Sequence, residues 1–227
     1  MSATAQYAMI TGAKIIPPSQ KDQGKGMPDV RTTNTGAGVV IIEQYNNNAH
    51  NHPHVKTNSN NSVVCLVALI EGSGPDAGNA NDVGGKGKSP TRTIVNEAEE
   101  ELGLDLSTPK RRHMIACDSP GVDLTRRNGD HIYRARLIRV DGLSDGNFQR
   151  MMRQRRAQGA PHHFLEMTKL VHLPIYRINA ALHKSPQAKT ITIEAVDGKK
   201  YKLTARLTSI LRKGLVNKTN RQLFGLD

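Results

Sequence analysis

The sequence has no tryptophan, only two cysteines, and aromatic residues at just 4% of its 227 positions. Two cysteines cannot form the disulfide framework of a small secreted domain, so we expect a reducing compartment such as the cytoplasm. The longest apolar run covers residues 63–70, which is too short for a membrane helix, and the first ten residues have no features of a secretory signal. We therefore expect a soluble chain without membrane partners.

Positive charge is in excess, with 32 Lys and Arg against 20 Asp and Glu and a formal net charge of +12. Such an excess raises the local concentration of polyanions, including nucleotides and RNA. The few aromatic side chains leave little material for a platform on which bases stack. We therefore expect a nucleotide or RNA partner that is bound through its phosphates.

The chain divides into a polar N-terminal arm, residues 1–35, and one domain, residues 36–227, with a C-terminal hairpin and helix. Residues 8–16 of the arm are apolar enough to form an edge strand. Residues 46–61 should form an exposed loop, and the glycine-rich residues 72–88 a second loop that contains a Gly-Gly-Lys turn.

Periodicity predicts strands at 39–45, 63–71, 113–118, 131–140, 170–173, 190–195 and 200–207, and helices at 90–102, 147–158, 176–184 and 208–216. Strands and helices alternate without a repeat. This order predicts an α/β or α+β fold in which a mixed sheet is sandwiched between helices.

The helix at 90–102 has clear signals at both ends. Ser89 is a good N-cap, Pro90 suits the first helical position, and Gly103 provides a C-terminal stop. We therefore expect its faces to be well defined, with an apolar stripe at Ile94, Ala98 and Leu102.

A second face of this helix carries Glu97, Glu100 and Glu101 at spacings of three and four residues. Like charges at these spacings repel by roughly a few tenths of a kcal/mol per pair, so we expect another interaction to offset this repulsion. One interpretation is a solvated charged surface. The other is a site for Mg²⁺ or Mn²⁺, because these ions prefer clustered oxygen ligands.

Residues 84–90, Gly-Gly-Lys-Gly-Lys-Ser-Pro, and 96–104, Asn-Glu-Ala-Glu-Glu-Glu-Leu-Gly-Leu, together resemble the Nudix box. The family pattern ends in Arg-Glu-hydrophobic-x-Glu-Glu-x-Gly-hydrophobic, and the resemblance extends more weakly over residues 39–181. Two positions depart from it: Asn96 replaces the arginine that helps orient a glutamate, and Lys88 replaces an upstream glutamate. Arg92, one turn before Asn96, is a candidate to compensate by reaching the same carboxylates.

The resemblance implies a hydrolase that cleaves a pyrophosphate bond in a nucleoside diphosphate linked to another moiety, with Mg²⁺ or Mn²⁺ as the cofactor. It implies that Glu97 and Glu101 coordinate the metal and that the backbone carbonyl of Gly85 contributes. Glu100 is then a further ligand or an orienting group. The general base stays open between Glu97 and Glu166, which lies before the strand at 170–173.

Four arginines, Arg150, Arg153, Arg155 and Arg156, precede Glu166. Guanidinium groups can bind phosphates in a forked geometry, so these residues are candidate substrate ligands together with Arg92. A solvated basic helix is the alternative interpretation.

Two functions remain open at this point. The first is a Nudix-type hydrolase that acts on a free nucleotide derivative or, as the net charge favours, on the capped or triphosphorylated 5′ end of RNA. The second is a Nudix-fold regulatory module that binds nucleotides or RNA without turnover, which Lys88 and Asn96 favour. The oligomeric state cannot be predicted from these patterns.

Overall fold

The computed structural model describes residues 35–46, 62–87, 89–115, 120–125 and 131–226. Its elements are β1 (Thr35–Asn46), β2 (Ser62–Glu71), β3 (Ala80–Asn81), β4 (Val83–Gly87), α1 (Pro90–Leu102), α2 (Pro109–Met114), β5 (Gly121–Thr125), β6 (His131–Arg139), α3 (Asp145–Ala157), the 3-10 helix η3 (His162–Leu165), β7 (Met167–Pro174), α4 (Ile175–Lys184), β8 (Thr192–Glu194), β9 (Lys200–Lys202), α5 (Ala205–Val216) and α6 (Lys218–Leu223). No helix among the described residues is long and apolar enough to cross a membrane.

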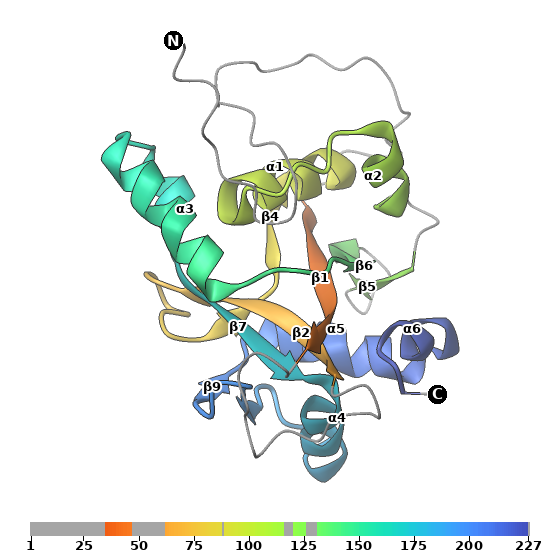
Figure 1. Ribbon diagram of the computed structural model, residues 1–227. Helices are drawn as coiled ribbons and strands as arrows, with labels where there is room; N and C mark the ends of the chain where they lie inside the picture. Colours follow the sequence, from red (N-terminus) through yellow and green to blue (C-terminus); the bar gives the residue numbers. More distant parts are fainter. Residues whose placement is uncertain (1–34, 47–61, 88, 116–119, 126–130, 227) are drawn as a thin grey trace.

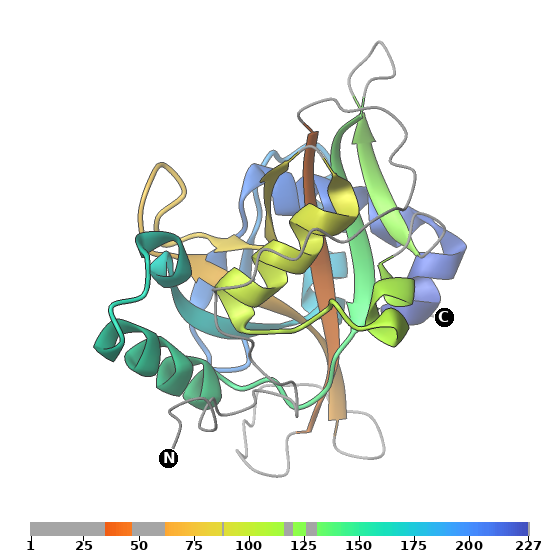
Figure 2. The ribbon, with the colours of Figure 1, turned by 90° about the horizontal axis from the view of Figure 1, so that it is seen from above.

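A mixed seven-stranded sheet forms the centre of the molecule, and its main path runs β3-β2-β1-β6-β5. Strand β4 also pairs with β1, and β7 also pairs with β2. The β1–β6 pair is parallel, whereas the other pairs of this sheet are antiparallel. Helices α1, α2 and α3 lie on one side of the sheet and α4, α5 and α6 on the other (Figures 1 and 2). The predicted fold class, a mixed sheet between helices, is therefore confirmed.

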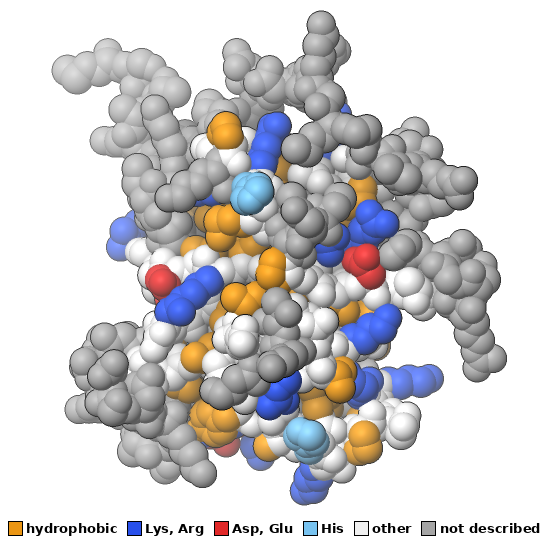
Figure 3. Space-filling view, turned by 90° about the vertical axis from the view of Figure 1, so that its right-hand side faces the viewer, with side chains coloured by type: hydrophobic (Ala, Val, Ile, Leu, Met, Phe, Trp, Pro, Cys, Tyr) orange, Lys and Arg blue, Asp and Glu red, His pale blue; other side chains and the backbone are white. Residues whose placement is uncertain are grey.

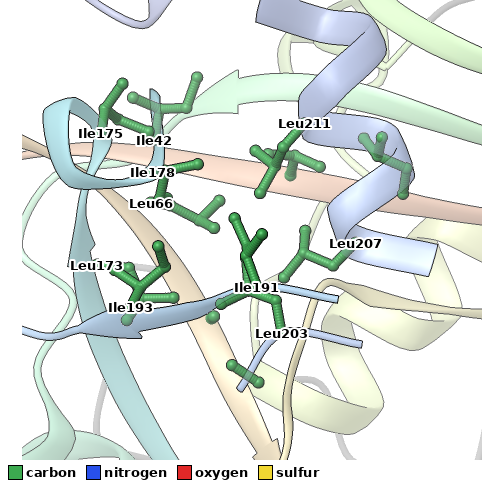
Figure 4. Packing of buried hydrophobic residues seen from close by; sticks show 14 of the residues in the cluster. Ile42, Leu66, Leu173, Ile175, Ile178, Ile191, Ile193, Leu203, Leu207 and Leu211 are labelled. Atoms are coloured by element: carbon green, nitrogen blue, oxygen red, sulfur yellow. The ribbon is translucent and has the colours of Figure 1, made fainter. Parts of the chain in front are cut away.

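Strand β1 shows how the two cores are built. Val39 and Ile41 face the core shared with α1 and α3, whereas Val40 and Ile42 face the core shared with α4 and α5. Ile42, Leu66, Leu173, Leu207 and Leu211 pack together on the second side (Figure 4). Because side chains alternate along a strand, this run of apolar residues is buried on both faces of the sheet.

The sheet divides along β1. Residues from Thr35 to Val39 pair with β4, whereas residues from Ile41 to Asn46 pair with β2. The end of β2 pairs in turn with β3, and only Asp82 separates β3 from β4. Asp82 therefore lies where the two branches of the sheet diverge.

The prediction of a strand at 113–118 is wrong for the residues that the structure describes. His113 and Met114 end helix α2, Ile115 forms a turn, and residues 116–119 lie outside the described part of the chain. Pro109 at the first helical position starts this helix, and its last turn carries basic residues that suit a helix C-terminus. Ile115, one of the apolar residues that suggested a strand, is buried in the core that the sheet shares with α1 and α3.

The glycine-rich residues 72–88 are more regular than predicted, because they contain β3 and β4. The expected Gly-Gly-Lys turn is part of β4, paired with β1. Near the C-terminus, β9 ends at Lys202, so the predicted strand at 200–207 is too long. Thr204 caps α5 by accepting a hydrogen bond from Leu207 N at 3.2 Å, which starts that helix before 208.

The remaining predicted strands and helices occur with ends displaced by a few residues, whereas β5, η3 and α6 were not predicted. The C-terminal hairpin and helix share a core with the central sheet, through Ile193, Leu203 and Leu207. The apolar stretch at 8–16, nearly all of the arm at 1–35 and most of the loop at 46–61 lie outside the described residues, so those predictions stay predictions.

Three glycines make room for one tyrosine ring on the sheet. A Cβ atom on Gly38 would lie 2.0 Å from Tyr133 Oη, and one on Gly84 would lie 2.2 Å from it. A Cβ on Gly36 would lie 2.4 Å from Cδ2 of the same ring. Tyr133 Oη donates a hydrogen bond to Asp82 at 2.6 Å, so these glycines let the ring reach the division of the sheet.

We predict that Gly38→Ala lowers the free energy of unfolding by about 1–3 kcal/mol, the usual cost of overpacking a core. Urea denaturation of the purified protein measures this change. Gly146→Ala in α3 is the matched control, because its added Cβ has no atom within 4 Å apart from its chain neighbours and the backbone of its own helix. That control should be neutral or slightly stabilising, and equal stability of the two variants would contradict the prediction.

Candidate functional site

Helix α1 has the ends that the sequence predicts. Ser89 Oγ accepts a hydrogen bond from Arg92 N at 3.4 Å, and Pro90 occupies the first turn. At the other end Gly103 adopts a left-handed conformation with φ 64°, and its N–H donates to the carbonyl of Glu99 at 2.9 Å. The apolar stripe is buried as predicted, which fixes the direction of the acidic face.

Glu101 is a buried carboxylate without a complete set of partners. Glu101 is 8% exposed, and its Oε2 atom has no hydrogen-bond partner among the described residues. Burial raises the pKa of Glu101 well above its ordinary value, and the negative charges of Glu97, Asp82 and Glu71 raise it further. Arg206 acts in the opposite direction. Such a group is stabilised by a cation or by a proton.

Glu97 lies against the backbone of β4. A Cβ atom on Gly85 would fall 1.9 Å from Glu97 Oε1, so only glycine permits this approach. Burial raises the pKa of Glu97 to about 7, the charges of Glu100 and Glu166 add to this increase, and Arg206 opposes it. Gly85 and Glu97, which the sequence places in one site, are therefore brought together.

Glu100 and Glu166 complete the group of predicted carboxylates. Burial raises the pKa of Glu100, and the charge of Glu166 contributes to the increase. Glu166 follows η3, and its backbone carbonyl accepts a hydrogen bond from Gly72 N at 2.8 Å. Its side chain is 43% exposed and lies 3.5 Å from Nδ1 of His162. The end of β2 thus holds Glu166 within electrostatic range of Glu97 and Glu100.

Three further residues of this region have no signal in the sequence. Asp82 has a fully buried side chain, and its Oδ1 pairs with Arg206 Nε at 2.9 Å. Tyr133 donates to the other carboxylate oxygen and lies beneath the Arg206 guanidinium, whose carbon is 4.8 Å from the ring centroid. Burial raises the pKa of Tyr133 well above its ordinary value, and the charge of Asp82 raises it further. Burial lowers the pKa of Arg206, but the charge of Asp82 outweighs this effect and helps to raise it.

The residues present fit a divalent cation of the Mg²⁺ type. In the described part of the chain, no three His, Cys, Asp or Glu side chains are already grouped as a complete set of metal ligands. Mg²⁺ does not need such a set, because it commonly binds through one or two carboxylates and keeps waters or substrate phosphates as its other ligands. The unpartnered oxygen of Glu101 and the raised pKa of Glu97 identify two carboxylates that a cation would stabilise.

The four arginines of α3 separate into two groups. Arg155 is buried, and its guanidinium donates to the carbonyls of Glu99, at 2.7 Å, and Glu100. It also lies 5.0 Å from the centre of the Phe164 ring. Arg155 therefore joins α3 to the end of α1 and to η3, and it leaves the set of candidate phosphate ligands.

The other candidate arginines are exposed. Arg150, Arg153 and Arg156 lie on the solvent side of α3, where they remain candidates. Arg92 is exposed in the first turn of α1, and within the described residues its side chain forms no ion pair with the carboxylates. The cation near Glu97 and Glu101 is Arg206 instead, from a helix more than a hundred positions further along the chain.

No protein-family model and no curated protein matches this sequence. Similar solved structures include a MutT/nudix family protein from Enterococcus faecalis, with 11% identity, a TM-score of 0.42, and coverage of 88% of this chain and 71% of that chain. A mutT/nudix family protein from Listeria innocua has 13% identity and a TM-score of 0.39, with 86% and 99% covered. A MutT NUDIX hydrolase from Burkholderia pseudomallei has 24% identity and a TM-score of 0.25, with 49% and 68% covered.

The chain is thus similar to proteins of the family that its glutamate motif resembles. At identities of 24% or less, however, these similarities concern the fold alone. Because the TM-scores are below 0.5, these similarities say nothing about the reaction.

We predict that Glu101→Gln stabilises the metal-free protein at pH 8 by about 1–3 kcal/mol, because a neutral amide replaces a buried negative charge that lacks a complete set of partners. The raised pKa means that folded protein binds more protons than unfolded protein, so stability is lost as pH rises through the folded pKa of this carboxyl. At pH 5 the difference from wild type should be smaller. Urea unfolding in excess chelator at both pH values measures it.

The control is Glu166→Gln, which changes a more exposed carboxylate of the same cluster. It should alter stability little at either pH. A Glu101→Gln variant that is no more stable than wild type at pH 8 would show that the buried carboxylate costs the fold nothing.

Proposed function

We propose that this chain is a metal-dependent hydrolase of the Nudix type, which cleaves a pyrophosphate bond in a nucleoside-diphosphate-linked substrate, including the 5′ end of an RNA. The observation that carries the proposal is the buried, unpartnered carboxylate oxygen of Glu101. It lies one helical turn from Glu97, whose carboxylate rests on Gly85. Arg206, the nearby cation, is already paired with Asp82, so these glutamates still require positive charge.

In this proposal Glu97 and Glu101 hold Mg²⁺ or Mn²⁺, the backbone of Gly85 contributes an oxygen, and Glu100 orients the group or adds a ligand. When bound, such an ion would neutralise phosphate charge and lower the pKa of a bound water. The site's own residues must then accept a proton. Glu97, whose carboxylate lies against Gly85, is the first candidate base, and Glu166 is the second.

The basic surface supports a substrate with a chain of phosphates. Helix α3 is joined to α1 through Arg155 and exposes Arg150, Arg153 and Arg156 to solvent. On the face of the molecule that bears α2, β5 and α6, Lys and Arg side chains outnumber Asp and Glu (Figure 3). The net charge of +12 extends this preference over the whole chain. We therefore favour RNA over a free dinucleotide.

The alternative function is a regulatory module that binds nucleotides or RNA without turnover. Asn96 favours it, because this residue is exposed and neutral at the position of the box arginine. Turnover distinguishes the two functions, since the alternative predicts binding without product.

We predict that the purified protein releases phosphate-containing products from at least one of three substrates, ADP-ribose, a nucleotide sugar or 5′-triphosphorylated RNA, only with Mg²⁺ or Mn²⁺. Glu101→Gln should abolish turnover and keep the fold, because the amide keeps the shape but loses the charge that holds the ion. Product chromatography measures the reaction, and circular dichroism checks the fold. Activity in excess chelator, or full activity of Glu101→Gln, would refute the metal site.

Two further variants in the same assay identify the base. If Glu166 accepts the proton, Glu166→Gln should lower kcat by about two to four orders of magnitude with little change in metal affinity. If Glu97 serves instead, Glu166→Gln should be nearly silent, whereas Glu97→Gln should lose both metal affinity and turnover. We favour Glu97.

We also predict a steep salt dependence of RNA binding. For an RNA of about ten nucleotides, contact with about six phosphates should reduce affinity roughly a thousandfold between low and physiological salt. Replacing Arg150, Arg153 and Arg156 together by alanine should flatten this dependence and leave turnover of a small nucleotide nearly unchanged. Fluorescence anisotropy over a salt series measures the slope.

Arg155 is kept in that triple variant because it supports the fold. A salt-independent affinity would exclude the proposed phosphate contacts. If the triple variant lost small-substrate turnover as severely as RNA binding, these arginines would belong to the reaction site and not to a separate RNA-binding surface.

A further inference from the structure

Arg206, in the first turn of α5, binds the segment that enters β4. Its Nε donates to Asp82 Oδ1 at 2.9 Å, and its Nη2 lies 3.5 Å from the carbonyl oxygen of Gly84. The side chain of Asp82 is fully buried, and Tyr133 satisfies its other oxygen at 2.6 Å. One guanidinium thus holds both ends of the short segment that immediately precedes Gly85.

The start of α5 is itself fastened to the same part of the sheet. Thr204 Oγ1 donates to Asn81 Oδ1 at 2.9 Å, and Thr204 N donates to the carbonyl of Ala80 at 3.0 Å. Arg206 therefore projects from a helix end that is fixed relative to β3. Its position against Asp82 is determined by backbone contacts as well as by charge.

Helix α1 does not provide an equivalent cation. Asn96 is neutral and exposed, and the side chain of Arg92 is exposed in the first turn. Arg206 is also close enough to act on both candidate metal ligands, because its charge lowers the pKa of Glu97 and of Glu101 against the effect of burial.

We propose that Arg206 is a positioning residue that takes the place of the arginine missing at position 96. It fixes the segment from Asp82 to Gly84, and thereby the Gly85 backbone on which the Glu97 carboxylate rests, so that Glu97 and Glu101 keep the spacing needed for one divalent cation. This role rests on the proposed metal-dependent function. It makes the C-terminal extension an integral part of the site.

The test compares Mn²⁺ affinity, measured from the electron paramagnetic resonance signal of the unbound ion, in four forms of the full chain. These are wild type, Arg206→Lys, Arg206→Gln and the double variant Asp82→Asn/Arg206→Gln. Arg206→Gln should weaken Mn²⁺ binding about ten- to hundredfold, the usual effect of losing a group that orients a ligand. Arg206→Lys should recover part of the affinity, because its ammonium can still bind Asp82 but cannot also reach the carbonyl of Gly84.

The double variant separates positioning from stability. Removing both charges should restore the thermal stability that Arg206→Gln loses, but it should not restore Mn²⁺ affinity. Lys213→Gln is the matched control, because it removes one positive charge from the same helix, where Lys213 contacts the carbonyl of Asp123. If Arg206→Gln does not fold, the double variant and Arg206→Lys decide the question.

If the loss of Arg206 only removed a positive charge and left the metal ligands in place, Mn²⁺ binding would tighten. Tighter or unchanged binding in Arg206→Gln or in the double variant therefore overturns the proposal. Hydrogen exchange of residues 80–87 in the metal-free proteins provides a readout that needs no ion. The variants that lack Arg206 should exchange there at least about tenfold faster, and unchanged exchange overturns the proposal. If wild type binds no Mn²⁺ the proposed function fails, and this exchange measurement alone decides whether Arg206 holds the segment.

Discussion

The close approach of α1 to strand β4 is the constraint on which the candidate site depends. A Cβ atom on Gly85 would meet the Glu97 carboxylate, and one on Gly87 would lie 2.1 Å from Thr93 Oγ1. Two glycines on one face of β4 therefore leave the space that the side chains of Glu97 and Thr93 occupy between the helix and the strand. The caps at Ser89 and Gly103 fix the ends of the helix, and this packing fixes its rotation and its distance from the sheet.

That packing places more negative charge in one region than its cations offset. Glu97, Glu100 and Glu101 lie on α1, and Glu166 reaches the same region from the segment before β7. The charge of Asp82 acts on Glu101 as well. Burial is the largest cause of the raised pKa in all three helix glutamates, and repulsion between the carboxylates adds to it. A fold that needed only stability would place apolar residues here, so the cost points to a ligand.

Local patterns were enough to predict α1, its caps, its apolar stripe and the group of glutamates, because each signal lies within one helix. They failed where contacts between distant segments decide the outcome. Arg155 looks like its exposed neighbours in the sequence, yet its position on the inner face of α3 directs it to the carbonyls of Glu99 and Glu100. The pairing of Asp82 with Arg206 spans 124 positions, and no periodicity or motif connects them.

The glycine-rich residues before α1 show why composition misled the prediction of a loop. Glycine is typical of turns, but the missing Cβ atom of Gly84, like those of Gly36 and Gly38 on β1, creates space for the ring of Tyr133 on the face opposite α1. Gly85, the next residue in β4, faces α1 and receives Glu97. Because neighbouring residues of a strand point to opposite faces, consecutive glycines at 84 and 85 serve both sides of the sheet. One side holds the Tyr133–Asp82–Arg206 network, the other holds the glutamates, and the single strand between them links the C-terminal helix to the candidate metal site.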